Sequence, residues 1–294
     1  MILGRWRRSP ALGHLKRFIR WLLNQEANFN QNWERNMKNT LKIAALALVV
    51  GLSGAASALA EQVKVGFAAE PYPPFTSLDA NGKWTGWEVD FTDAICKEAK
   101  LDCVVTPVAW DGIIPALTSK KVDMIIGSMS ITEERLKTID FSDKYYSNPA
   151  GIIAAKDEKL DATPEGLAGK IIGVQIATNH AAYVKKHFPK AAEIKEYQTQ
   201  DEANQDLAAG RIDAVQAGAI ALDAFLKSAA GACCELKGNV EPDVEVLGPG
   251  IGIGLRKEDG ALKDKLNAAI KAIRENGTYD TFSKKYFDFD IYGG

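Results

Sequence analysis

The residues with the clearest binding chemistry lie in the stretch Gly-Ser-Met-Ser-Ile-Thr-Glu-Glu-Arg at positions 127–135, directly after the apolar run 122–126. Four of the five residues of that run are bulky and apolar, which is typical of a buried parallel strand. Ser130 and Glu133 have the spacing of a capping box, so we expect a helix to begin there with its free N–H groups at the carboxyl end of the strand. With the guanidinium of Arg135 nearby, this pattern predicts a carboxylate site. The alternative interpretation is an ordinary capped helix with a solvated arginine.

A second group of side chains follows the first predicted strand, 63–67. Prolines at positions 71, 73 and 74 make the next loop extended and rigid, so Glu70 and Tyr72 are held beside the strand end. Trp110 stands at another junction between a strand and a helix. These positions favour a cleft, although both aromatic rings would also suit an ordinary core.

The elements that must position these residues form two series of alternating strands and helices. The first series has expected strands at 63–67, 103–108 and 122–126, with a helix at 87–100. The second has strands at 170–175, 193–197 and 212–216 and helices at 178–187, 201–210 and 219–229. This rhythm predicts an α/β protein with two lobes, each a βαβ-based sheet flanked by helices. The glycine-rich strand 248–256 suits a hinge crossing, and helices at 262–275 and 278–286 end the chain.

The first 60 residues have the features of a targeting segment. From Met37 a short basic region precedes the apolar stretch 43–50, and the sequence Ser-Ala-Leu-Ala ends at Ala60. This is the pattern of a secretory signal peptide over 37–60, cleaved near Ala60, so we expect an exported protein. Residues 1–36 are then interpreted as a non-native or mis-assigned extension; the alternative is a basic helix at a membrane surface.

Charge and motifs exclude several partners. The chain has 36 Lys and Arg and 38 Asp and Glu, of which 9 and 2 lie in residues 1–60, so the remainder has 27 bases, 36 acids and a net charge of −9. Nucleic acid is therefore not an expected partner. The glycines at 250–254 precede no helix cap, and no P-loop motif is present, so a nucleotide site is not expected. No cofactor is predicted.

The four cysteines of an exported chain suggest disulfides. Cys96 lies in the last turn of the predicted helix 87–100 and Cys103 opens the next strand, which makes a bridge between them plausible. Cys233 and Cys234 are adjacent, and they are either free thiols or a rare vicinal bridge. A metal site is the weaker interpretation because no histidine lies near any cysteine in the sequence.

Taken together, the residues after 60 resemble a known family, the periplasmic solute-binding proteins of ABC importers for polar amino acids. Within this family the chain particularly resembles the lysine/arginine/ornithine-binding type and its octopine- and nopaline-binding relatives. The stretches that carry the resemblance are 127–135, Phe-Ser-Asp-Lys-Tyr-Tyr at 141–146, Gly-Leu-Arg-Lys at 254–257, Gly-Thr-Tyr-Asp at 277–280 and Lys-Lys-Tyr-Phe-Asp at 284–288.

The resemblance implies a two-lobed periplasmic-binding-protein fold with two crossing hinge strands and a ligand in the cleft. Lobe 1 would comprise 61–148 and 249–294, and lobe 2 would comprise 149–248. Such a protein is not an enzyme, resides in the periplasm and delivers a small molecule to an inner-membrane ABC permease. Cys96 and Cys103 match the family's disulfide.

The resemblance also assigns roles to individual residues. Arg135 would clamp the ligand's α-carboxylate, with hydrogen bonds from Ser130 and the backbone at Gly127 and Ser128. Thr178 and Asn179 would close on the ligand from the second lobe. The aromatic rings of Tyr72 and Trp110 are further expected contacts, and the acid Glu70 would receive a distal cation. Gln175 is expected to line the cleft or, alternatively, only to satisfy backbone groups. His180 is a candidate contact whose alternative role is a solvated cap residue.

One departure from the family affects the ligand prediction. Where typical members carry an aspartate for the ligand's α-ammonium group, this chain has Gly218. Glycine removes a negative charge and is expected to open space, which suits an arginine-derived opine such as octopine or nopaline, because an opine has a secondary amine with a second carboxylate. The alternatives are a lysine, arginine or ornithine binder, or a cyclohexadienyl or arogenate dehydratase of the same fold that uses Glu70 as an acid or base.

Overall fold

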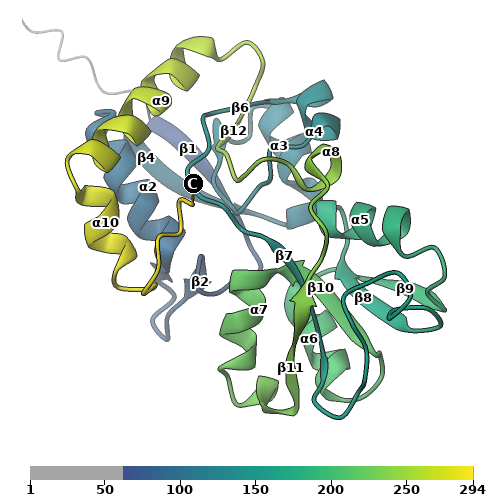
Figure 1. Ribbon diagram of the computed structural model, residues 1–294. Helices are drawn as coiled ribbons and strands as arrows, with labels where there is room; N and C mark the ends of the chain where they lie inside the picture. The colour runs from purple at the N-terminus through teal and green to yellow at the C-terminus, as the bar shows by residue number, and fades with distance from the viewer. Residues whose placement is uncertain (1–61, 294) are drawn as a thin grey trace, which may run out of the picture. The chain divides into compact units, whose positions relative to one another are not determined.

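The computed structural model describes residues 62–293. The expected extension (1–36) and signal peptide (37–60) lie outside the described residues. Two five-stranded sheets and the helices packed on them account for the fold, together with a small hairpin of β2 (Ser77–Leu78) and β3 (Trp84–Thr85). Figure 1 shows the two sheets with their helices.

The first sheet has the strand order β4-β1-β5-β12-β6. Its strands are β1 (Gln62–Ala68), β4 (Asp102–Val108), β5 (Met124–Ile125), β6 (Asp140–Phe141) and β12 (Gly254–Leu255). β1 runs parallel to both β4 and β5, as the alternation of strands and helices predicts. Its helices are α2 (Trp87–Glu98), α3 (Ile113–Thr118), α4 (Glu133–Thr138), α9 (Gly260–Glu275) and α10 (Thr278–Ser283).

The second sheet has the order β11-β7-β10-β8-β9. Its strands are β7 (Ala150–Ala155), β8 (Ile171–Gln175), β9 (Glu193–Tyr197), β10 (Ala214–Gly218) and β11 (Cys234–Asn239). Its helices are α5 (Asn179–His187), α6 (Gln200–Ala208), α7 (Ala219–Leu226) and the short α8 (Val244–Leu247). The parallel strands β8, β9 and β10 match the second predicted series, whereas the antiparallel β7 and β11 were not anticipated.

Large aromatic side chains fill the core between the first sheet and helices α2, α9 and α10. Trp87 is fully buried, and its indole N–H donates to Ser283 Oγ at 2.9 Å. Phe91 stacks on Tyr145 with ring centroids 4.3 Å apart. Because these contacts join α2 to α10 and to the segment after β6, they fix the start of α2 against the sheet. This start carries a residue that matters below, Glu88.

The chain passes between the two sheets twice, before β7 and before β12. The two crossing segments pair with each other, since Ile251 N–H donates to the Tyr146 carbonyl at 3.0 Å and Tyr145 N–H donates to the Ile251 carbonyl at 2.9 Å. An antiparallel bridge joins Tyr146 and Ile251. The crossing strands agree with the expected two-lobed arrangement, and the proposed lobe boundaries at 148/149 and 248/249 fall in these segments.

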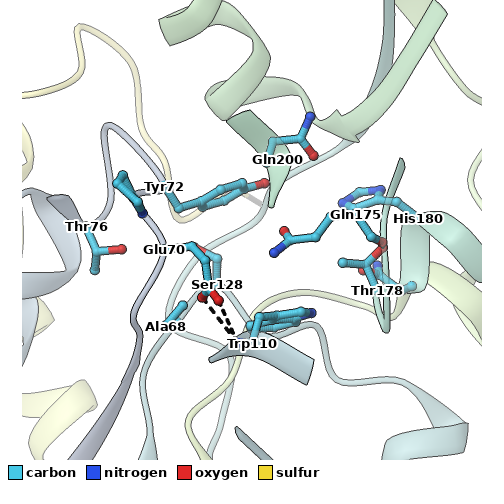
Figure 2. A pocket seen from close by; sticks show the side chains of 13 residues that line it. Ala68, Glu70, Tyr72, Thr76, Trp110, Ser128, Gln175, Thr178, His180 and Gln200 are labelled. Carbon is cyan, nitrogen blue, oxygen red and sulfur yellow. Dashed lines mark hydrogen bonds between the residues drawn. The ribbon is translucent and has the colours of Figure 1, made fainter. Parts of the chain in front are cut away.

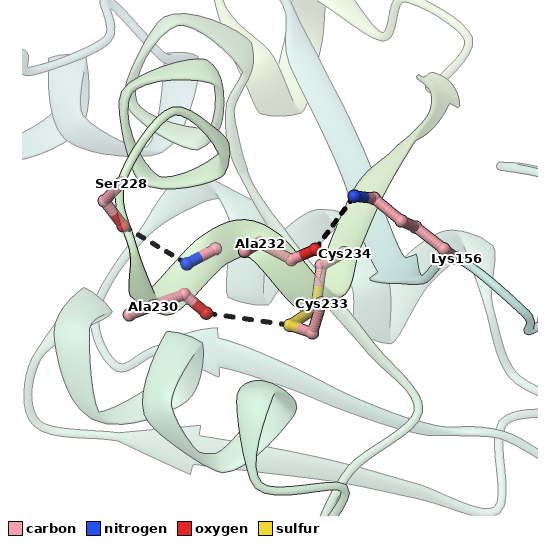
Figure 3. Close-up of a disulfide and its surroundings, with 7 residues drawn as sticks. Lys156, Ser228, Ala230, Ala232, Cys233 and Cys234 are labelled. Carbon is pink, nitrogen blue, oxygen red and sulfur yellow. Dashed lines mark hydrogen bonds between the residues drawn. A yellow bond between two sulfur atoms is a disulfide. The ribbon is translucent and has the colours of Figure 1, made fainter.

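Both cysteine pairs are bridged. Cys96 at the end of α2 is joined to Cys103 in β4, with Cα atoms 6.1 Å apart, which is the pair that the sequence suggests. Cys233 and Cys234 form the vicinal bridge that was one of two alternatives for them. Figure 3 shows this bridge between the short helix at 230–233 and β11, where the Lys156 ammonium group donates to the Ala232 carbonyl.

The predicted capping box at Ser130 and Glu133 is wrong. Helix α4 begins at Glu133 and is capped by Thr132, whose hydroxyl accepts the Arg135 N–H at 3.3 Å. Ser130 is instead held in an extended segment that bridges to Ile251. A local sequence pattern cannot anticipate this, because the partner strand comes from the second crossing, 121 residues later in the chain. No helix within 62–293 is long and apolar enough to cross a membrane.

Candidate functional site

A cavity lies between the ends of the two sheets, where ligands bind in open α/β proteins. Its empty volume is about 570 Å³, including the opening to solvent. We call the lining residues that precede β7 the first wall: Ala68, Glu70, Pro71, Tyr72, Thr76, Trp110, Gly127 and Ser128. The second wall consists of Gln175, Thr178, Asn179, His180 and Gln200. Figure 2 shows the side chains of both walls, with Tyr72, Trp110 and Gln175 directed into the cavity.

In the first wall, Glu70 and Trp110 are joined by hydrogen bonds. Glu70 lies just after β1, and Trp110 begins the short helix after β4, so the two adjacent parallel strands bring them together. The Trp110 backbone N–H donates to both oxygens of the Glu70 carboxylate, at 3.3 and 3.2 Å (Figure 2). This holds the only acidic side chain among the lining residues at a defined place beside an aromatic face.

Tyr72 projects from the proline-rich loop that the sequence marks as rigid. Its backbone N–H donates to the Thr76 carbonyl at 2.7 Å, and its ring stacks on Phe75 with centroids 5.8 Å apart. Burial raises the pKa of Tyr72, so the phenol stays neutral at physiological pH. It is therefore a neutral hydrogen-bonding group on an aromatic surface.

Ser128 contacts a buried acid that the sequence analysis missed. Its backbone N–H donates to Glu88 Oε1 at 2.6 Å, and its hydroxyl donates to Glu88 Oε2 at 3.2 Å. The expected role of the Ser128 N–H, to hold a ligand carboxylate, is therefore already taken up by Glu88. Glu88 is the second residue of α2, a position that no motif distinguishes from other first-turn acids.

Arg135 and Ser130 lie next to the cavity but not among its lining residues. The Arg135 guanidinium lies 5.6 Å from the centre of the Trp110 ring and donates to the Ser130 carbonyl at 3.0 Å. It is 9% exposed, and burial lowers its pKa to about 10, which leaves it charged at physiological pH. Within 62–293 no carboxylate forms a salt bridge with it. A buried cation without an anionic partner is suited to receive an anion from outside the protein.

The second wall is built around the start of α5. The Thr178 hydroxyl caps this nine-residue helix by accepting the Ala181 N–H at 3.1 Å. The helix itself is the one that the sequence predicts at 178–187. The backbone N–H groups of Asn179 and His180 make no hydrogen bond within the described part of the chain. The positive end of a helix with free N–H groups favours an anion. This start of α5 therefore supplies the helix terminus that the sequence analysis placed at α4.

Two hydrogen bonds join a residue of one wall to a segment directly beside the other wall. The Asn179 side-chain amide donates to Ser130 Oγ at 3.0 Å, and the Trp110 indole N–H donates to the Ala177 carbonyl at 3.3 Å. Both use neutral groups. Loss of solvation lowers the pKa of His180 to about 4, and the charge of Arg135 adds to this effect, so His180 is neutral near pH 7. His180 Nδ1 is buried without a hydrogen-bond partner within 62–293.

Sequence reasoning missed four other lining residues, namely Ala68, Pro71, Thr76 and Gln200. Gln200 follows β9 in the same way that Gln175 ends β8, so the rule that places ligands at the carboxyl ends of strands would have found it. Gln175 donates to the Gln198 carbonyl at 3.2 Å, and Gln200 donates to Asn204 at 3.0 Å. Both amides thus keep further hydrogen-bonding capacity for a ligand.

The fold and this cavity agree with comparisons to known proteins. The model of the bacterial extracellular solute-binding proteins, family 3, matches residues 63–289. The chain belongs to this family. It is 41% identical over 256 residues to the lysine/arginine/ornithine-binding periplasmic protein of Escherichia coli (strain K12), which covers 85% of this chain and 98% of that relative. The family resemblance inferred from the sequence is thereby confirmed.

Solved structures of similar proteins share the two-lobed family 3 fold. An ancestral arginine-binding protein bound to arginine has a TM-score of 0.71 and 35% identity, covering 77% of this chain and 98% of the other. A periplasmic His/Glu/Gln/Arg/opine family-binding protein from Silicibacter pomeroyi in complex with lysine has a TM-score of 0.68 and 34% identity, covering 79% and 100%. The relatives in these comparisons are described as binding proteins, in agreement with the expectation that this chain is not an enzyme.

Gly218 occupies a different environment in this solute-binding protein from the one that the sequence suggests. It is buried at the end of β10, and a Cβ atom there would lie 2.2 Å from the Asn148 side-chain nitrogen. The Asn148 side chain accepts the Ile220 N–H at 3.2 Å. The expectation that glycine opens space is therefore wrong, because an amide from the first crossing segment fills the place. Asn148 is neutral, so the inference that this place lacks a negative charge is unchanged.

Proposed function

We propose that this protein is the periplasmic substrate-binding component of an ABC importer and that it captures an amino-acid-derived ligand with a carboxylate at one end and a cation at the other. The observation that carries the proposal is the placement of two opposite charges around one tryptophan. Glu70 accepts the Trp110 backbone N–H, and Arg135 lies over the Trp110 ring. The relatives named for lysine, arginine and ornithine support the same ligand class.

The carboxylate end of the ligand is assigned to the region of Arg135. The free N–H groups at the start of α5 and the neutral His180 lie on the opposite wall. A charge-assisted hydrogen bond from a buried guanidinium is about twice as strong as a neutral one. Arg135 therefore provides the main attraction, and α5 adds neutral donors.

The cationic end is assigned to Glu70 and the surfaces of Tyr72 and Trp110. Glu70 is the only carboxylate among the lining residues, and no Lys or Arg is among them. A guanidinium or ammonium group there would meet one negative charge and two aromatic faces, which is a favourable environment for a cation. The dehydratase alternative is less favoured, because the lining residues hold no second carboxylate and the imidazole of His180 lies on the opposite wall from Glu70.

Within this class we favour an arginine-derived opine such as octopine or nopaline. A free α-ammonium group is best held by a carboxylate, and the neutral pair of Gly218 and Asn148 does not supply one at that place. An opine carries a secondary amine and a second carboxylate, which an acid there would repel. Since Asn148 fills the room beside Gly218, the argument rests on charge alone.

Isothermal titration calorimetry with L-arginine, L-lysine, octopine and nopaline tests the proposal. We expect micromolar or tighter binding of at least one ligand with a guanidinium group, and octopine or nopaline to bind more tightly than arginine. Tighter binding of arginine or lysine than of either opine would reject the opine and keep the importer role. Absence of binding to all four, together with turnover of arogenate or prephenate, would reject the proposed function.

A further inference from the structure

A buried carboxylate lies directly behind the first wall of the cavity. Glu88 is fully buried and is not a lining residue. Its Oε1 accepts two hydrogen bonds, from the Ser128 N–H at 2.6 Å and from the Tyr145 hydroxyl. Its Oε2 accepts the Ser128 hydroxyl at 3.2 Å. Ser128, which does line the cavity, therefore stands between this acid and any ligand.

These contacts fix both the conformation and the hydrogen-bond polarity of Ser128. Its φ angle is +54°, in the left-handed region that residues other than glycine rarely adopt, so the contacts must hold it there. Both polar hydrogens of Ser128 point to Glu88. A hydroxyl has one hydrogen and two lone pairs, so with its hydrogen on Glu88 the Ser128 oxygen can only accept further hydrogen bonds. One lone pair faces the nearby Tyr146 hydroxyl, which leaves one for the cavity.

We propose that Glu88 is a specificity-determining residue that acts through Ser128: by taking the hydroxyl hydrogen, it makes this part of the wall an acceptor for a donor-bearing, cationic group. The inference rests on the proposed function, because it concerns the cationic end of that ligand. Glu88 does not touch the ligand; it positions the residue that does. Glu70 supplies the charge on the same wall, and Ser128 supplies a directed neutral acceptor.

The surroundings of Glu88 make its ionisation sensitive to pH near neutrality. The titratable groups that face it are Tyr72, Tyr145 and Tyr146, and no Lys or Arg within 62–293 forms an ion pair with it. Loss of solvation raises the pKa of Glu88 to about 7, against the effect of the hydrogen bonds from Tyr145 and Ser128. A protonated Oε2 would donate to the Ser128 hydroxyl oxygen, and the hydroxyl hydrogen would turn toward the cavity.

In the isosteric variant Glu88→Gln, the Ser128 hydroxyl hydrogen should point toward the cavity at every pH. Because the position of Oε1 receives two donors, the amide oxygen must occupy it, and the NH₂ group must then donate to the Ser128 hydroxyl. We expect the affinity for L-arginine and octopine to fall about tenfold, because the Ser128 hydroxyl hydrogen would then face the N–H donors of the ligand's guanidinium group. L-citrulline is the neutral isostere of arginine and carries an oxygen acceptor in place of one nitrogen. Its affinity for the variant should be little changed or higher. The arginine-to-citrulline affinity ratio at pH 8 is the decisive measurement, and an unchanged ratio overturns the inference.

The matched control is Asp90→Asn on the same helix. Asp90 accepts hydrogen bonds from Lys285 and Tyr286 outside the cavity, so the same change of acid to amide should leave the ratio unchanged. From pH 8 to pH 5.5 the affinity of the wild-type protein for arginine should fall toward that of Glu88→Gln, whose affinity should stay constant. A wild-type affinity independent of pH in this range also counts against the inference.

A second variant keeps the test decisive if Glu88→Gln does not fold. Ser128→Gly removes the hydroxyl, while glycine adopts a φ of +54° without strain. The arginine-to-citrulline ratio should again fall several-fold, and a ratio equal to that of the wild-type protein would refute the inference. Wild-type protein that binds neither arginine nor octopine would overturn the proposed function and this inference together, whereas binding with an unchanged ratio overturns the inference alone.

Discussion

The two walls of the cavity differ in how they carry charge. The first wall has a half-buried acid, Glu70, that lines the cavity, and it is backed by two buried charged groups, Glu88 and Arg135. The second wall offers neutral groups only: the amides of Gln175, Gln200 and Asn179, the start of α5, and a His180 whose pKa is lowered to about 4. From this difference we expect the first wall to discriminate between ligands and the second wall to contribute similarly to the binding of each.

The difference has a physical advantage for a protein that must release its ligand. The direct hydrogen bonds between the walls, from Asn179 and Trp110, involve neutral groups, and each is worth about 0.5–1.5 kcal/mol. Separation of the walls therefore leaves no buried charge without its partner. A salt bridge across the cavity would oppose opening much more strongly.

The largest expected effect is that of Arg135→Ala. The change removes the buried cation beside the cavity, so the affinity for an arginine or opine ligand should fall about a hundredfold or more. Calorimetry at pH 7.5 measures it. Arg211→Ala is the control, because Arg211 is an exposed residue paired with Asp206 on the second sheet. Equal affinity of the two variants would break the assignment of the carboxylate end.

The next effect concerns the cationic end. Glu70→Gln preserves shape and the bond from the Trp110 N–H but removes the charge, so arginine should bind about tenfold more weakly. Citrulline should change far less, because it has no charge for Glu70 to attract. The exposed Glu196, which pairs with Lys185, provides the control variant Glu196→Gln. A similar loss for both ligands would assign Glu70 a structural role.

A smaller effect is expected on the second wall. Asn179→Ala removes the amide that reaches Ser130 across the cavity, and affinity should fall about fivefold for every ligand alike. Surface plasmon resonance should locate the loss in faster dissociation, because this contact holds the walls together. A change that is confined to one ligand would contradict the view that the second wall does not discriminate.

The smallest effects concern the free energy of unfolding as a function of pH. They have opposite signs for Glu88, behind the first wall, and His180, in the second wall. The pKa of Glu88, about 7, is raised by burial, so the folded protein binds an additional proton between about pH 4.5 and pH 7, and the free energy of unfolding falls as pH rises through this range. His180 has a lowered pKa of about 4, so the unfolded protein binds an additional proton between about pH 6.5 and pH 4. The free energy of unfolding therefore falls as pH falls through this range.

Urea denaturation at several pH values separates these contributions. Relative to the wild-type protein, Glu88→Gln should become progressively more stable as pH rises from 5 to 8, by roughly 1–3 kcal/mol. His180→Gln should gain relative stability as pH falls from 6.5 to 4.5. If both variants follow the wild-type pH dependence, the charge states that we assign to Glu88 and His180 are incorrect.

Much of this molecule was predictable because local patterns reflect local forces. The periodicity of apolar residues gave the parallel strands, and β9 has the predicted bounds Glu193–Tyr197. The proline-rich loop placed Glu70 and Tyr72 beside a strand end, and the predicted helix 178–187 matches α5, which begins at Asn179. Strand ends of parallel sheets converge, so Trp110 and Gln175 could be assigned to the same cavity.

Other features depend on contacts between distant segments, which no local pattern encodes. Glu88 is an unremarkable acid in the first turn of a helix until packing places Ser128, 40 residues later, against it. Ser130 matches a helix cap in sequence but is bridged to Ile251. Asn148 fills the place beside Gly218, 70 residues away, which the sequence alone suggests is open.

By itself the sequence determined the family, the order of the elements and the residues that carry the outer charges of the site, since these follow from hydrophobic periodicity and short motifs. Only the tertiary structure decided which polar groups are already partnered. Hydrogen bonds saturate: once the Ser128 N–H donates to Glu88, it no longer serves a ligand, and this allocation is set by three-dimensional packing.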